Sequence, residues 1–235
     1  MTVPEIMTEL QAKGSESIKN VLVKHGVKEP FFGVKIEYLK PIQKKIKTDY
    51  QLAKDLYATG NADAMYLAGL IADDEQMTPG DLDNWAEKAL SQNISEYTVP
   101  WVAAQGKHGF EMAMKWIDSP QEHIAAAGWS TLNNFIALTP DDKLDLPALT
   151  KLMARVKDHI HGAQNRVKYT MNGFVVGVAC YVTPLKNEAL AIANSIKDVT
   201  VDMNGTSCKL PRAADYVSKL EARGALGKKK KMVKC

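Results

Sequence analysis

One carboxylate with aromatic neighbours is the part of this sequence best suited to chemistry. Glu96, Tyr97 and Trp101 lie close together where a helix is expected to begin, since Pro100 suits a first helical turn. A carboxylate beside aromatic rings can accept a cationic base and stabilise developing positive charge. The competing interpretation makes Glu96 a surface residue near a helix start. The surrounding stretch, Ile94–Phe135, holds three of the four tryptophans, and such residues are more often core than site.

Metal and covalent chemistry have weaker candidates. His159 and His161 lie near no clustered carboxylates, and the acidic run Asp73–Glu75 lies at a helix end, so we expect neither a metal site nor a cofactor. Cys208 lies beside Lys209, which could activate its thiol. The sequence contains no phosphate-binding glycine loop, nucleophile elbow or HExxH motif.

The composition is that of an ordinary globular protein, with 46% hydrophobic and 24% charged residues in a chain of 235. Three widely separated cysteines argue against a disulfide framework. No apolar run reaches the roughly 18 residues of a membrane span, and the N-terminus has no signal-peptide pattern. We therefore expect a cytoplasmic protein that does not enter a membrane.

Charge is distributed unevenly along the chain. Without the five lysines that follow Gly227, 25 basic residues face 27 acidic ones. Lys13–Lys47 and Lys151–Lys186 are basic, and Asp49–Glu87 between them is acidic. If the chain curves, the two basic stretches could form one face for nucleic acid. The alternative is that they are solvated helix faces.

Repeated helix-start signals predict the architecture. Ser-Pro or Thr-Pro pairs place a capping hydroxyl before a proline at Thr78-Pro79, Ser119-Pro120, Thr139-Pro140 and Thr183-Pro184. Ser119 with Glu122 fits a capping box. Apolar residues follow these starts at helical spacing. We predict an all-α protein, a right-handed superhelical array of antiparallel helix pairs like a HEAT or armadillo solenoid, over residues 1–226 as one domain.

The C-terminal third adds three expectations. In the helix 163–182, one side carries a polar and small-residue face: Arg166, Tyr169, Thr170, Gly173, Gly177 and Tyr181. Alternating residues around Asn204-Gly205 predict a small hairpin over 199–210, with an ordered loop as the alternative. The lysine-rich tail, residues 227–235, is expected to be disordered.

Four segments resemble one known family. They are GVKIEYLKPIQKKIK, LAKDLYATGNADAMYLAGLIAD, IDSPQEHIAAAGWSTL and VKYTMNGFVVGVACYV. In this order, over Phe31 to Ile196, they look like the DNA alkylation repair family, the AlkD-like alkylpurine DNA glycosylases. The resemblance implies a C-shaped HEAT-like solenoid with a basic concave face for duplex DNA. Active members excise cationic N3- and N7-alkylated purines with a catalytic aspartate and two tryptophans.

The resemblance breaks at the catalytic positions. The first tryptophan position falls on Glu96 and the aspartate position on Pro100, while the second tryptophan falls on Phe174. An arginine pair of the family falls near Ala125 and Ala126. Glu96 is the only nearby carboxylate that could replace the aspartate.

Three functional hypotheses follow. The first is a DNA-binding family member, expected to be monomeric, whose glycosylase activity is weak, altered or absent. The second is an active glycosylase using Glu96, with Tyr97, Trp101 and Phe174 facing the lesion. The third is a helical-repeat scaffold for proteins. Binding of double-stranded, potentially damaged, DNA would use phosphate contacts from Lys35, Lys40, Lys44, Arg166 and Lys168, with the lysine tail as a further candidate.

Overall fold

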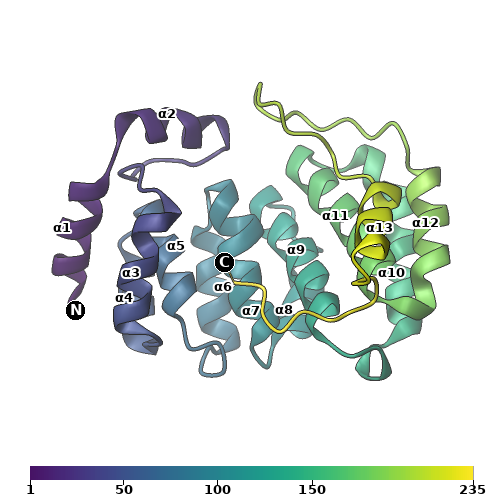
Figure 1. Ribbon diagram of the computed structural model, residues 1–235, viewed down its shortest axis with the longest axis horizontal. Coiled ribbons are helices and arrows are strands. Elements are labelled where there is room, and N and C mark those ends of the chain that lie inside the picture. Colours follow the sequence, from purple (N-terminus) through teal and green to yellow (C-terminus); the bar gives the residue numbers. More distant parts are fainter. Residues whose placement is uncertain (235) are drawn as a thin grey trace.

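Helix follows helix in the computed structural model, which describes residues 1–234 (Figure 1). The α-helices are α1 (Val3–Lys13), α2 (Glu16–Lys24), α3 (Ile36–Ile46), α4 (Tyr50–Ala58), α5 (Ala62–Ile71), α6 (Pro79–Lys88), α7 (Val99–Gln105), α8 (Gly109–Trp116), α9 (Glu122–Leu138), α10 (Leu146–His159), α11 (Asn165–Tyr181), α12 (Lys186–Ser195) and α13 (Ala213–Ala222). Short helical turns are η1 (Ile94–Thr98), η2 (Asp141–Lys143), η3 (Ile160–Gly162) and η4 (Thr183–Leu185). Residues 1–234 contain no strand, which confirms the predicted all-α, HEAT-like class.

The helices form two layers. In the inner layer, α9 packs along both α7 and α11, and η1 contacts α5. Helices α4, α6, α8 and α10 pack behind them. Trp116 and Trp129 are at most 2% exposed and Trp101 is 5% exposed, so the three tryptophans of Ile94–Phe135 are buried, as expected for core residues. Figure 1 shows α3 and α13 in front of the inner layer, on opposite sides of it.

Only one Ser/Thr-Pro pair caps an α-helix as predicted. Thr78 and Asp81 form a capping box at α6. The predicted Ser119–Glu122 box is absent, because α9 starts later and the Glu122 carboxylate accepts a hydrogen bond from the backbone N–H of Arg166 (2.8 Å). The pairs at 139 and 183 begin short 3-10 turns. A Ser/Thr-Pro pair thus marks a turn into helical backbone, but not which kind of helix follows.

The predicted hairpin over 199–210 is wrong. Asn204 and Gly205 have the positive φ values of a tight turn, 52° and 71°. The Thr206 N–H closes this turn by donating to the Met203 carbonyl (3.0 Å), but no strand pairing continues on either side of it. Instead, the Asn165 side chain donates to the carbonyl of Asp202 (2.9 Å) and accepts from its N–H (2.7 Å). The segment is therefore an ordered loop held by the start of α11.

The tail also differs from expectation. From Gly227 it crosses the ends of α11, α9 and α7, where its backbone N–H groups donate to the carbonyls of Cys180 (2.9 Å) and Ala137 (2.7 Å) and to the side chain of Gln105 (2.8 Å). Figure 1 shows it as the yellow length of chain across the front of the molecule. Residues 228–234, here named the strap, thus follow a defined path instead of hanging free.

None of the described helices alone has both the length and the apolar character to cross a membrane; one bent pair, Asn165–Tyr181 with Thr183–Ser195, passes that test together.

Candidate nucleic-acid interface

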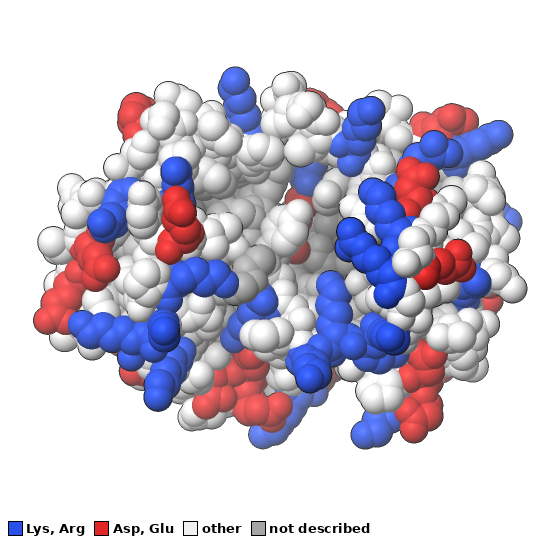
Figure 2. Space-filling model, viewed as in Figure 1, with Lys and Arg blue, Asp and Glu red and all other residues white. Residues whose placement is uncertain are grey.

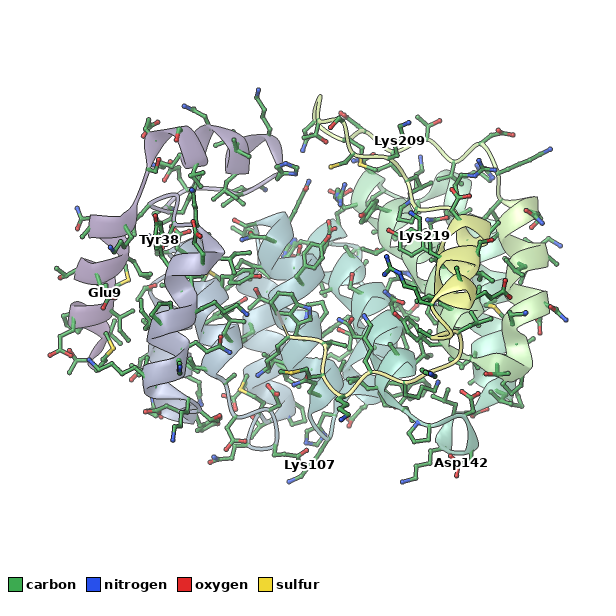
Figure 3. The ribbon with its side chains drawn as sticks, in the orientation of Figure 1. Glu9, Tyr38, Lys107, Asp142, Lys209 and Lys219 are labelled. Carbon is green, nitrogen blue, oxygen red and sulfur yellow. The ribbon has the colours of Figure 1, made fainter. Side chains whose placement is uncertain are left out.

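A wide groove of about 1000 Å³ opens on the face that carries the strap. One side is basic through Lys40, Lys44 and Lys47, on α3 and just after it. The strap contributes further lysines to the lining. Figure 2 shows this face hollowed at its centre, with Lys and Arg side chains gathered around the hollow. In Figure 3, Tyr38 on α3 and Lys219 on α13 mark the two sides of the face.

A smaller cavity of about 240 Å³ adjoins the strap between α7, α9, α11 and α13. Aromatic rings and amides dominate its lining: Tyr97, Trp101, Tyr169, Tyr181 and Tyr216, with Asn133 and Asn134. Gly177 leaves room here for the side-chain amide of Asn133, which a Cβ at that position would displace. We call this space the aromatic cavity.

The carboxylate of Glu96 lies at the edge of the aromatic cavity, but Arg166 occupies both of its oxygens. Arg166 Nε donates to Glu96 Oε1 and Arg166 Nη2 to Oε2, each at 2.6 Å. The Glu96 side chain is 2% exposed and that of Arg166 13%. The guanidinium also lies 4.3 Å from the Tyr169 ring centroid. Two parallel charge-assisted bonds in a buried setting hold both side chains in place.

Burial and pairing shift the ionisation of both partners. Burial raises the pKa of Glu96, and the hydrogen bonds and charge of Arg166 oppose that rise. For Arg166, burial acts to lower the pKa, but Glu96 outweighs it and the pKa is raised. Glu96 is therefore a carboxylate whose charge depends on its partner.

The local backbone that carries Glu96 is unusual. Residues Ile94–Thr98 form a π-helical turn that runs directly into α7. The Thr98 hydroxyl makes no capping hydrogen bond to α7 and donates instead to the carbonyl of Asn93 (3.3 Å). The wider turn brings Glu96 inward and leaves Tyr97 at 45% exposure. π-turns of this kind often occur at functional sites.

Two of the three aromatic residues predicted to face a lesion lie at one place in the structure. Tyr97 and Trp101 lie together, with ring centroids 6.1 Å apart, and both line the aromatic cavity. The assignment of Phe174 to this group is wrong. Phe174 is fully buried and packs on Trp129, with 5.4 Å between ring centroids. The preceding residue, Gly173, is among the α11 residues that line the cavity, whereas Phe174 points into the core.

The predicted DNA-contacting residues divide into three groups. Lys40 and Lys44 line the groove. Lys35 is exposed beside Glu37 (3.4 Å), and Lys168 is half-buried; neither is among the residues that line the groove. Arg166 is wrong as a phosphate contact, because Glu96 already takes its guanidinium.

Tyr169 and Tyr181 are not among the predicted site residues, although the sequence pattern places both on one face of α11 with Gly173 and Gly177. The structure confirms that face, which lines the aromatic cavity. Asn133 and Asn134 gave no signal in the sequence. Among residues 1–234, no cluster of three metal-ligating side chains occurs.

Comparisons with known proteins agree on this architecture. A family model described as "DNA alkylation repair enzyme" matches residues 6–175. Uncharacterized proteins of Listeria innocua and Listeria monocytogenes are each 28% identical over 229 residues, covering 95% of this chain and 99% of theirs. A solved structure with 37% identity and a TM-score of 0.90 covers 100% of both chains. It is described as a new family related to the HEAT-like repeat DNA glycosylases, with affinity for branched DNA structures.

Proposed function

Because this chain belongs to the DNA alkylation repair enzyme family, we propose that it binds branched DNA across its groove and does not excise alkylated bases. The observation that carries the proposal is the bidentate pair between Glu96 and Arg166. Affinity for branched DNA in the similar solved structure supports the choice of ligand.

Base excision needs negative charge near the sugar, where positive charge develops as the base leaves. Glu96 is the only acidic residue among the described residues that line the aromatic cavity. Its two oxygens are taken, and the guanidinium cancels its charge. By the resemblance to the family, the aspartate position falls on Pro100, which has no carboxylate. The aromatic cavity therefore has no free carboxylate to assist excision.

The aromatic cavity instead suits an unpaired base. Aromatic rings bind nucleobases by stacking, and this mode tolerates any base. Asn133 and Asn134 make no side-chain hydrogen bond within residues 1–234, so their donors and acceptors are available to a base edge. Branch points in DNA offer bases without a paired neighbour. Duplex arms would then follow the lysines of the groove, Lys40, Lys44 and Lys47.

The test compares a three-way junction with a duplex of equal length and sequence, using fluorescence anisotropy over a salt series. We expect the junction to bind more tightly, and both affinities to fall steeply with salt because lysines meet phosphates. Equal affinity for junction and duplex would refute branch recognition. No binding of either DNA at low salt would favour the scaffold hypothesis.

Tyr97→Ala should reduce junction affinity about 5- to 150-fold, the range that corresponds to one lost stacking contact of about 1–3 kcal/mol. Duplex affinity should change little. Tyr38→Ala is the matched control, since Tyr38 is similarly exposed (39%) but does not line the aromatic cavity. The same loss in both variants would contradict a specific role for the aromatic cavity.

A further inference from the structure

The strap crosses the groove along a path that its own lysines fix at two points. The first anchor is Lys234, whose Nζ lies 2.7 Å from Asp74 Oδ1 and donates to the carbonyl of Ala72 (3.1 Å). Its side chain is only 6% exposed. Gln105 joins Asp74 to the strap a second time, because its amide donates to Asp74 Oδ2 (2.8 Å) and accepts from the N–H of Val233 (2.8 Å).

The second anchor lies at the other end of the strap. Lys229 Nζ lies 2.7 Å from Asp141 Oδ1 and donates to the carbonyl of Ile136 (2.9 Å). The next residue, Lys230, donates its N–H to the carbonyl of Ala137 (2.7 Å). Each anchor therefore combines a partly buried ion pair with backbone hydrogen bonds, which a freely moving tail would not form.

The strap changes the charge of the surface beneath it. That surface carries Asp73, Asp74 and Glu75 on one side and Asp141 on the other, all of which would repel a phosphate backbone. Two strap lysines neutralise Asp74 and Asp141. The remaining three, Lys228, Lys230 and Lys231, are exposed. Lys230 and Lys231 line the groove with Lys40, Lys44 and Lys47.

We propose that the strap is a built-in part of the DNA-binding surface, which covers an acidic floor and presents Lys228, Lys230 and Lys231 to the phosphate backbone. This inference rests on the proposed binding of DNA. A segment that inhibited binding by imitating DNA would be acidic. The strap is basic, as expected of a segment that contacts DNA phosphates.

The test is DNA binding by the full-length triple variant Lys228→Ala/Lys230→Ala/Lys231→Ala, which keeps both anchors. We expect an affinity loss of at least about tenfold at about 0.1 M salt, and a salt slope smaller by about 2 to 3, for up to three lost phosphate contacts. The charge-matched control replaces Lys151, Lys157 and Lys197, exposed lysines of α10 and of the turn after α12, by alanine. That control should keep most of the affinity and the slope.

Three results would overturn the strap's role. If the unaltered protein binds DNA and the triple variant has the same affinity as the unaltered protein or as the control variant, the strap makes no phosphate contact. The proposed function then still stands. If the triple variant binds more tightly, the strap inhibits. If the unaltered chain binds no DNA at low salt, the proposed function fails and the strap's role fails with it.

The attachment of the strap to the helical body can be tested without DNA. Asp74→Asn removes the charge that holds Lys234, so trypsin should cleave the strap faster than in the unaltered protein, with unchanged thermal stability of the helical body. Mass spectrometry of the cleaved ends measures this directly. An unchanged cleavage rate would refute Asp74 as an anchor.

Discussion

Arg166→Met is expected to lower the free energy of unfolding by about 3–5 kcal/mol, because it leaves the buried Glu96 carboxylate without its partner. Urea unfolding followed by circular dichroism measures the loss. The double variant Glu96→Leu/Arg166→Met removes both charges and should recover most of it. A catalytic Glu96 that did not depend on Arg166 would show little loss in the single variant.

The loss should also depend on pH. Burial raises the pKa of Glu96, and without Arg166 nothing in the pair opposes that rise. In Arg166→Met the folded protein therefore binds a proton more tightly than the unfolded chain, so its stability falls as pH rises from the ordinary glutamate pKa to the raised one. In the unaltered protein, protonation of Glu96 at low pH would break the pair. The difference in unfolding free energy between Arg166→Met and the unaltered protein should thus become smaller as pH is lowered. A difference that stays constant with pH would contradict the pairing of these charges.

Asp63→Ala is the second large expected effect, a loss of about 3 kcal/mol or more in unfolding free energy, since each buried donor left unpaired costs about 1–3 kcal/mol. Asp63 accepts hydrogen bonds from three successive backbone N–H groups, those of Phe32 (2.6 Å), Gly33 (3.0 Å) and Val34 (3.2 Å). These bonds join the segment before α3 to α5, so they position the lysines of α3. Urea unfolding of the variant beside the unaltered protein measures the loss.

Asp63→Asn is the matched control, since it keeps one acceptor oxygen in the same shape and should lose less. Burial raises the pKa of Asp63, and the three backbone N–H groups oppose that rise. Burial therefore disfavours the charged form of Asp63, while the three hydrogen bonds favour it. Equal losses for Ala and Asn would mean that the negative charge, and not the number of accepted hydrogen bonds, stabilises this joint.

The layered helical fold could be predicted because its determinants are local. Apolar spacing and caps such as Thr78 with Asp81 act within a few residues of each other. Local rules failed where a distant residue competes for the same group. Glu122 binds the backbone of Arg166 instead of capping α9, and Asn165 takes the backbone of Asp202 away from a hairpin.

The candidate site was predictable only in outline for the same reason. Glu96, Tyr97 and Trp101 are neighbours in sequence, so their association was visible. Arg166 lies 70 residues beyond Glu96. Its basic character alone predicts a DNA contact, whereas in the structure its guanidinium pairs with the Glu96 carboxylate. The strap could not be predicted for a similar reason. Its lysine-rich composition indicates disorder. Its ordered path depends on ion pairs with Asp74 and Asp141, which lie far away in the sequence.

Incubation with a duplex carrying N7-methylguanine, at protein excess, tests the central claim most directly. Abasic sites and binding are measured in the same samples. The Glu96–Arg166 pair predicts bound DNA with no more abasic sites than a sample without protein. Release of the methylated base by the unaltered protein, abolished by Glu96→Gln, would contradict this claim and establish Glu96 as a catalytic carboxylate.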